Sequence, residues 1–317
     1  MDHGAGGATT VPSNGLPPPV PGETFELTGR AGRIAGYAAG QGLPVLLLHS
    51  INAAASAYEI RPIFERLARH RQVVAIDLPG FGRSERGPRR YDARLYTDAI
   101  HDALDHVASV TGTPACDALA VSLSSEFLAR AATERATPPR SLALITPTGF
   151  SSRDLSRPKT TGSREIPGLH ALLEGPPWRQ GLFDLLVSRR SIRYFLKRTF
   201  GREDVDEGLV EYCWRTAHEP GARHAPYAFV SGRLFTKGIR LIYEQLAMPV
   251  WLTTAAKGDF RDFAGLGWVR ERRNWLIHDF PTGALPHFEQ PDPFVTAYRA
   301  FLQAAGQIQA RAAAAPA

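Results

Sequence analysis

Four short apolar runs, separated by segments with helical periodicity, constrain the fold of this chain most strongly. Each run is too short for a helix and has the composition of a strand that is buried on both faces of a sheet. The runs cover residues 44–49, 73–77, 116–121 and 142–146, and helical patterns follow at 56–69, at 95–110 and directly after residue 122. This alternation predicts an α/β fold with a doubly wound, mostly parallel sheet. A loosely alternating stretch at 25–39 predicts an antiparallel hairpin at the sheet edge.

The strand–helix alternation stops between residues 151 and 247, where only helical patterns occur, at 181–199, 205–217 and 227–246. We interpret 151–247 as a helical cap (lid) inserted into a core formed by 23–150 and 248–306. Strands at 248–254 and 275–280 and a helix near 293–303 complete that core. The segment 181–199 has Leu, Ile and Phe on one side and basic residues on the other, so the alternative is a membrane-surface helix. The Gly/Pro-rich residues 1–22 and the Ala-rich residues 307–317 predict flexible tails.

The net charge of +6 arises mostly in the predicted cap, where 16 basic residues face 11 acidic ones. This surplus can attract an acidic substrate or a membrane surface, or it can form a solvated arginine-rich face. No basic run is interleaved with aromatic residues, so we expect no nucleic-acid partner. No apolar run approaches the roughly 18 residues of a membrane span. The two cysteines and the lack of a signal-peptide pattern at the start predict a reducing, cytoplasmic setting.

The stretch from Cys116 to Arg130 predicts a buried strand, a sharp turn and a helix that starts at once. This layout is that of a nucleophile elbow, in which a strained turn exposes a serine hydroxyl above a sheet. The helix N-terminus beneath it offers unpaired N–H groups that can hold an oxyanion. The usual pattern is G-x-S-x-G, whereas Ala120 and Ser124 flank Ser122 here. A simpler alternative is a strand–helix junction with Ser122 as the helix N-cap.

Four motifs in chain order resemble those of the α/β-hydrolase fold superfamily in its lidded form, and the resemblance covers about residues 25–302. LLLHSINAAASAYE resembles the strand and His-Gly turn that donates one oxyanion N–H. AIDLPGFGRSER resembles the D-x-P-G-x-G-x-S loop and is the most specific match. ALAVSLSSEF resembles the elbow, and TGALPHFEQPDPF resembles the segment that contains the catalytic histidine. In this superfamily the catalytic triad follows the chain order Ser, acid, His.

By this resemblance Ser122 is the nucleophile, and the backbone N–H groups of Leu123 and Ile51 form the oxyanion hole. A serine at this position argues against dehalogenase or epoxide-hydrolase chemistry, which would use an aspartate. The acid should follow the strand near 250–254, where Asp259 matches the family position better than Asp262. The resemblance gives no cofactor, and no cluster with metal-ligand spacing and no phosphate-binding glycine loop is evident, so we expect neither a metal nor a cofactor.

The sequence departs from the family pattern G-H-x-P-x-x-E, because Ala284 stands where the histidine is expected. His287, three residues later on the same loop, is the nearest substitute for the catalytic base. Other candidate bases are His49, which ends a central strand, His218 and His224 in the predicted cap, and His278 in the last strand. Each of them is also compatible with a structural hydrogen-bonding role.

Three functional classes therefore remain open. The first is a serine hydrolase that acts on an ester, thioester or similar acyl bond with Ser122, Asp259 and His287. The second is a lyase or cyclase on the same fold, and the third is a catalytically degenerate protein that binds a small molecule. The predicted cap is rich in Phe, Leu, Tyr and Trp, which favours a largely apolar small-molecule substrate.

Overall fold

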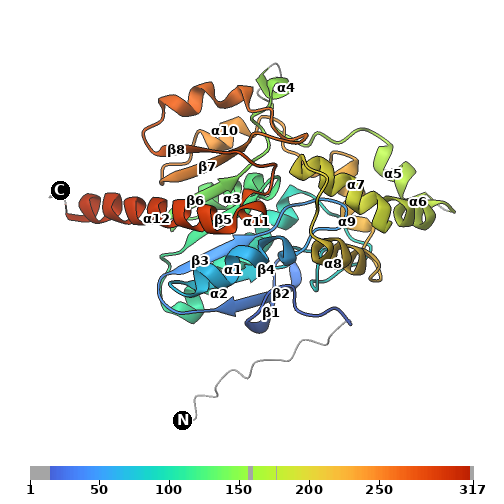
Figure 1. The fold of residues 1–317 in the computed structure, drawn as a ribbon, viewed down its shortest axis with the longest axis horizontal. Coiled ribbons are helices and arrows are strands. Elements are labelled where there is room, and N and C mark those ends of the chain that lie inside the picture. The colour runs from blue at the N-terminus through green and yellow to red at the C-terminus, as the bar shows by residue number, and fades with distance from the viewer. Residues whose placement is uncertain (1–14, 156–159, 176, 315–317) are drawn as a thin grey trace, which may run out of the picture.

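The computed structural model describes residues 15–155, 160–175 and 177–314 (Figure 1). Within these residues, eight strands form one sheet in the order β1-β2-β4-β3-β5-β6-β7-β8. The first two strands form the predicted hairpin, β2 runs antiparallel to β4, and all remaining neighbours are parallel. The strands are β1 (Glu23–Gly29), β2 (Gly32–Ala39), β3 (Pro44–Leu48), β4 (Gln72–Ile76), β5 (Asp117–Val121), β6 (Ser141–Ile145), β7 (Val250–Ala255) and β8 (Trp275–Phe280). The predicted mostly parallel α/β sheet is confirmed.

Helices cover both faces of the sheet, because alternate side chains of its strands point to opposite sides. In β3, Leu46 and Leu48 enter one apolar cluster with the side chains of α2 (Ala93–Thr111) and α3 (Ser124–Glu134). Val45 and Leu47 enter the other cluster, which contains residues of α1 (Arg61–Ala68) and α12 (Pro291–Ala314). Two short elements, the 3₁₀ helix η1 (Ala57–Ile60) and α11 (Pro286–Glu289), lie on the α1 side. Both faces are buried, which explains the unbroken apolar runs in the sequence.

In the described residues between β6 and β7 the regular elements are helices joined by turns and loops, and one isolated bridge pairs Ser163 with Thr236. Figure 1 shows α5 to α9 grouped on one side of the molecule, and α4 and α10 near β7 and β8. The helices are α4 (Ser152–Leu155), α5 (Leu169–Leu173), α6 (Arg179–Leu186), α7 (Arg189–Phe200), α8 (Glu207–Ala217), α9 (His224–Val230) and α10 (Arg240–Tyr243), and a second 3₁₀ helix, η2 (Ala264–Glu271), follows β7.

Two of the helices predicted in this insertion are broken. The predicted helix 181–199 divides at Ser188, whose hydroxyl accepts a hydrogen bond from the Ser191 N–H and caps α7. The predicted helix 227–246 is interrupted after α9, because Gly232 and Gly238 have positive φ angles of 80° and 60°. Both glycines also approach backbone oxygen atoms closely, so a helix through them is excluded by contact as well as by conformation.

Parts of both predicted tails are ordered in the structure: residues 16–20 pack against the protein, and α12 extends to Ala314. Leu16 and Val20 are buried, and the carbonyl of Pro17 accepts a hydrogen bond from the Tyr212 hydroxyl, so the chain packs against the molecule before β1. At the other end α12 continues to Ala314, past the predicted boundary at residue 307. Residues 1–14 and 315–317 lie outside the described part of the chain.

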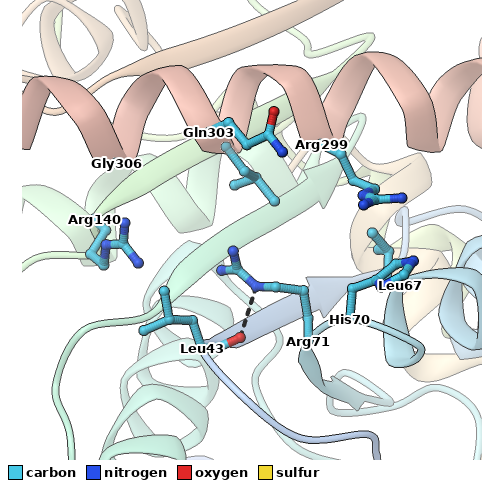
Figure 2. Close-up of a pocket in the computed structure, with 9 residues that line it drawn as sticks. Leu43, Leu67, His70, Arg71, Arg140, Arg299, Gln303 and Gly306 are labelled. Atoms are coloured by element: carbon cyan, nitrogen blue, oxygen red, sulfur yellow. Dashed lines mark hydrogen bonds between the residues drawn. The ribbon is translucent and has the colours of Figure 1, made fainter.

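At the amino-terminal ends of the parallel strands, the buried carboxylate of Asp117 joins the start of β5 to Arg71, in the loop before β4, and to the start of β6. It forms an ion pair with Arg71 and accepts a hydrogen bond of 2.7 Å from the Ser141 hydroxyl. Figure 2 shows Arg71, Arg140 and Arg299 around a cavity of about 360 Å³ at this edge. The cavity lies at the opposite ends of the strands from Ser122, and we assign its buried ion pair a structural role.

Candidate active site

Ser122 lies at a strained turn between β5 and α3, as the sequence predicts. Its φ is 53°, a left-handed conformation that is uncommon for any residue other than glycine. The Ser122 N–H donates to the carbonyl of Ile145 at 2.8 Å, which fixes the turn to the neighbouring strand. The helix α3 begins two residues later, so its N-terminal N–H groups lie next to the serine. This geometry is that of a nucleophile elbow.

Ser124 explains how the elbow tolerates a residue other than glycine at this position. Its side chain is buried, and its hydroxyl donates a hydrogen bond of 2.6 Å to the carbonyl of His49. The bond joins the start of α3 to the loop that follows β3. A glycine would leave this carbonyl without that donor, so Ser124 contributes a contact that the usual family pattern lacks.

His49 is a structural residue in this arrangement. Its ring is fully buried, with Nε2 accepting from the Leu78 N–H at 2.9 Å and Nδ1 lying 2.6 Å from the carbonyl of Ser50. An acceptor at Nε2 and a donor at Nδ1 define one neutral tautomer. Both ring nitrogens are therefore used to hold the loops after β3 and β4, and His49 does not offer a free base.

A buried carboxylate, Glu59, organises the loop that contains Ile51. It accepts hydrogen bonds of 2.9 Å from the Ser50 N–H, the Ser50 hydroxyl and the side-chain amide of Asn52. These contacts hold the Ser50 backbone and the Asn52 side chain, on either side of Ile51. Among the described residues we find no acceptor for the N–H of Ile51 or of Leu123, which leaves both groups available for an oxyanion. The sequence motif predicted the loop but not the role of Glu59.

Replacing Glu59 by alanine should destabilise the protein by about 2–3 kcal/mol, because three donors lose their buried acceptor. Ester turnover by the remaining folded protein should fall by ~100-fold, since the loop would no longer hold the Ile51 N–H in place. Urea denaturation and hydrolysis of p-nitrophenyl acetate measure the two effects. Glu65→Ala, at an exposed position of α1, is the matched control and should change neither. An unchanged turnover in Glu59→Ala would show that this loop does not position an oxyanion donor.

The Ser122 side chain lies at the wall of a cavity of about 340 Å³ at the carboxyl ends of β5 and β6. Residues of the insertion, including Arg164 and Phe235, form part of the same wall. Four phenylalanine side chains give the cavity an apolar part, and an ion pair of 2.7 Å between Arg164 and Asp154 lies among its polar residues. The residues that line it are Ser122, Thr146, Pro147, Thr148, Gly149, Phe150, Ser151, Arg153, Asp154, Arg164, Phe235, Asp259, Phe260, Asp262 and Phe263.

Both candidate acids, Asp259 and Asp262, line this cavity together with Ser122. The Asp259 carboxylate is half exposed and accepts a hydrogen bond of 2.5 Å from Arg198 Nε of α7. Asp262 accepts from the backbone N–H and the hydroxyl of Ser152. The structure thus places Asp259 in the same cavity as Ser122, where its ion-pair partner is the guanidinium of Arg198.

The position that the family gives to histidine is bonded to a residue that lines the Ser122 cavity. The carbonyl of Ala284 accepts a hydrogen bond of 2.7 Å from the hydroxyl of Thr146, the residue that follows β6. Thr146 has a φ of 44° and lines the same cavity as Ser122. Ala284 itself is buried and presents only a methyl group. Among the described residues, no hydrogen bond joins the Ser122 hydroxyl to an imidazole.

His287 has a different environment, in the apolar core beneath α1 and α12. Its ring is fully buried and packs against Phe294 with centroids 5.7 Å apart, and a backbone group of Glu59 lies beside it. Burial lowers the pKa of His287 to about 3, so the imidazole is a weak proton acceptor. It does not line the cavity of Ser122, and the structure does not bring it together with Asp259.

The other histidines named from the sequence also lie away from this cavity. His224 Nδ1 contacts Glu174 at 2.7 Å, and the His218 ring packs at a tilt against Trp214 in the same helical insertion. His278 stacks on Phe280 in β8. None of them is among the described residues that line the Ser122 cavity.

Glu126 is a buried carboxyl near the site that the sequence did not reveal. It lies in the first turn of α3 and accepts hydrogen bonds from the Thr148 hydroxyl at 2.5 Å and the Thr236 N–H at 2.8 Å. The pKa of Glu126 is raised, and burial of the carboxyl is the main cause. Because Thr148 lines the cavity and Thr236 belongs to the insertion, Glu126 joins the elbow helix to a cavity wall and to the insertion. Among the described residues, no group of three or more His, Cys, Asp and Glu could hold a metal ion.

The eight-stranded, mostly parallel sheet and the strained strand–helix turn at Ser122 are features of the α/β-hydrolase class, and the sequence comparison agrees with that class. Residues 45–297 match the Alpha/beta hydrolase family, and the chain belongs to that family. A curated haloalkane dehalogenase from Agrobacterium fabrum is 39% identical over 69 residues, which are 21% of this chain. That match spans about a fifth of the dehalogenase, 22% of its length.

Solved structures share the fold at low sequence identity. A meta-cleavage product hydrolase from Pseudomonas fluorescens is 16% identical, with a TM-score of 0.66 over 88% of this chain and 97% of that one. A thermophilic esterase from Thermogutta terrifontis is 18% identical, with a TM-score of 0.66 over 89% of this chain and 99% of that one. A membrane phospholipase A, described as a bacterial virulence factor, is 20% identical, with a TM-score of 0.68 over 89% and 86% of the two chains. These three structures are named as a hydrolase, an esterase and a phospholipase, and they show the fold that they share with this chain.

Proposed function

We propose that this chain is a slow serine hydrolase that cleaves an ester, thioester or similar acyl bond of a largely apolar small molecule. The observation that supports this most is the strained elbow, which presents Ser122 to a cavity between the strand ends and the helical insertion. In this proposal the Ser122 hydroxyl attacks the acyl carbonyl, and the N–H groups of Leu123 and Ile51 hold the developing oxyanion. The intermediate collapses to an acyl-serine and expels the alcohol or thiol, which carries away the proton of the serine hydroxyl. Water then attacks the acyl carbon, and the carboxylic acid leaves as the serine hydroxyl is regenerated.

Slow turnover follows from the residue at position 284. A serine hydroxyl without a positioned base is a weak nucleophile, and such a base contributes roughly 100- to 10,000-fold to the rate. Ala284 cannot take the proton, and in this proposal Asp259 remains paired with Arg198 until an imidazole is provided. His287 is the alternative base, and it would have to leave the apolar core to serve.

The substrate class is proposed from the composition of the cavity. Phe150, Phe235, Phe260 and Phe263 provide an apolar surface for an acyl or alcohol group, while the polar side chains line the rest. A panel of p-nitrophenyl esters of increasing chain length tests the proposal. We expect slow, saturable turnover with a preference for one acyl length. If every ester is hydrolysed at the same rate with the protein as in buffer alone, the proposed hydrolase activity is wrong.

A second candidate function is small-molecule binding without turnover, which Ala284 favours because the base is absent from its usual position. In that case an ester from the panel should bind at the cavity and remain intact. We also propose a reducing compartment, because Cys116 and Cys213 are buried free thiols. The helices of the described chain include none that is long and apolar enough to cross a bilayer.

A further inference from the structure

The outer edge of the insertion exposes an apolar surface on α5 and α6. Trp178, Leu182 and Leu185 lie at helical spacing on one side of α6 and are 50%, 41% and 70% exposed. The opposite side of the same helix buries Phe183, so the exposed face is not the packing face of α6. Leu172 of α5 is 59% exposed, and its carbonyl accepts a hydrogen bond of 2.9 Å from the Trp178 indole N–H. We call these four side chains the α5–α6 apolar face.

A cavity rich in arginine adjoins this face, and it shares no lining residue with the cavity of Ser122. It has a volume of about 850 Å³ and lies between the loop after β4 and the helices α5, α6 and α9. Four arginines line it, with Glu174 as its only described acidic residue. The two features are continuous along the chain, because Arg179 follows Trp178, and His170 and Glu174 flank Leu172. The lining residues are Arg86, Gly87, Pro88, Arg89, His170, Glu174, Arg179, Pro220, Gly221, Arg223 and His224.

The charge of this cavity is incompletely compensated. Glu174 contacts His224 at 2.7 Å and Arg223 at 3.6 Å. Within the described chain Arg86, Arg89 and Arg179 have no carboxylate within 4.0 Å. The buried Nε of Arg86 also has no hydrogen-bond partner. Arg86 donates to the carbonyls of Gly82 and Thr216 and to the Thr216 hydroxyl, and Arg89 donates to the Ala31 carbonyl. Neutral oxygen atoms therefore take the place of carboxylates around these two guanidinium groups, and a phosphate bound in the cavity would add a counter-charge.

We propose that the α5–α6 edge of the insertion docks on a membrane surface that contains anionic phospholipids. The α5–α6 apolar face enters the interface, and the arginines of the adjacent cavity hold headgroup phosphates. An anionic partner fits the charge better than a second copy of this chain, because the chain carries a net charge of +6. Leu and Trp beside Arg is the combination typical of elements that lie in a membrane interface.

Co-sedimentation with vesicles of phosphatidylcholine, with and without phosphatidylglycerol, tests the proposal on the full chain. We expect binding to the vesicles that contain phosphatidylglycerol, and its loss at high salt. The double variant Trp178→Ser with Leu182→Ser should weaken binding by at least ~10-fold, because less apolar surface enters the interface. The double variant Arg179→Gln with Arg223→Gln should weaken it by ~25-fold, at about fivefold for each arginine.

Two single variants provide matched controls. Leu276→Ser changes an exposed leucine on the edge strand β8, and Arg190→Gln changes an exposed arginine of α7 that does not line the cavity. Both should bind vesicles like the original chain. Thermal unfolding should be similar for the variants at Trp178, Leu182, Leu276 and Arg190, whose side chains are exposed. The Arg223 side chain is mostly buried and contacts Glu174 and Gln180, so thermal unfolding must first show that the double variant with Arg223→Gln is folded.

Other occupants of this surface would be recognised in the same experiments. Absence of binding to phosphatidylglycerol vesicles, or binding that the two double variants leave unchanged, overturns the proposal. Binding of inorganic pyrophosphate without vesicle binding would assign the cavity to a soluble phosphate compound and would also overturn it. A dimer in solution that the Trp178→Ser and Leu182→Ser changes dissociate would assign the apolar face to self-association instead.

Discussion

Changing Ser122 to alanine should reduce ester hydrolysis to the background rate of the buffer. The hydroxyl at the elbow is the only nucleophile in the proposed mechanism, so no acyl-enzyme can form without it. The fold should persist, because the Ser122 N–H bond to Ile145 does not involve the side chain. Turnover of the best p-nitrophenyl ester, compared with the buffer rate, is the measurement.

Ser122→Gly is the companion variant for this prediction. It should be equally inactive and should be more stable by about 1 kcal/mol, because glycine relieves the strain of the positive φ at this turn. Ser125→Ala changes a neighbouring buried hydroxyl that bonds to the Ala120 carbonyl, and it should retain turnover. If Ser122→Ala kept its activity while Ser125→Ala lost it, the assignment of the nucleophile would be wrong.

Changing Ala284 to histidine should increase ester turnover by about 100- to 10,000-fold, the usual contribution of a positioned base. The Ala284 carbonyl is bonded to Thr146, which lines the cavity beside Ser122, so an imidazole at position 284 starts from the correct loop. Asp259 lines the same cavity and can orient that imidazole once it exchanges its Arg198 partner. The measurement is kcat for the same ester in both proteins.

Two further variants separate this prediction from its alternative. Adding Asp259→Asn to Ala284→His should remove most of the gain, since the imidazole would lose its carboxylate partner. His287→Ala alone should leave turnover unchanged if His287 is only part of the core, although it opens a cavity beside Phe294 and will lower stability. A fall in kcat of ~100-fold or more in the folded fraction of His287→Ala, with no gain from Ala284→His, would instead identify His287 as the base.

The sheet could be predicted from the sequence because its strands are buried on both faces. The runs at 44–49 and 142–146 lie within one residue of β3 and β6, and β8 has the predicted bounds. The insertion was harder to predict, since its helices end at glycines whose positive φ depends on contacts with distant backbone. Gly232 approaches the carbonyl of Arg164, and Gly238 approaches that of Thr160. Helical periodicity does not contain that information.

The candidate site also combines features that local sequence predicts with features that depend on distant parts of the chain. The position of Ser122 and the loop of Ile51 follow local motifs, and the structure places both at the strand ends as expected. The partners of the charged residues do not follow from local sequence. Arg198 reaches Asp259 across 61 positions, and Glu126 reaches Thr236 across 110. Glu59 is close in sequence to the residues that it holds, but a single carboxylate in a loop has no distinguishing pattern.

The most direct test of the central claim is to locate the adduct of a fluorophosphonate probe by peptide mass spectrometry. Such a probe reacts with an activated serine hydroxyl, so it reports the nucleophile independently of the substrate. We expect a single adduct on Ser122, formed slowly in the original chain and at least ~100-fold faster in Ala284→His. An adduct on another residue, or no adduct on Ser122 in either protein, would show that Ser122 is not the nucleophile.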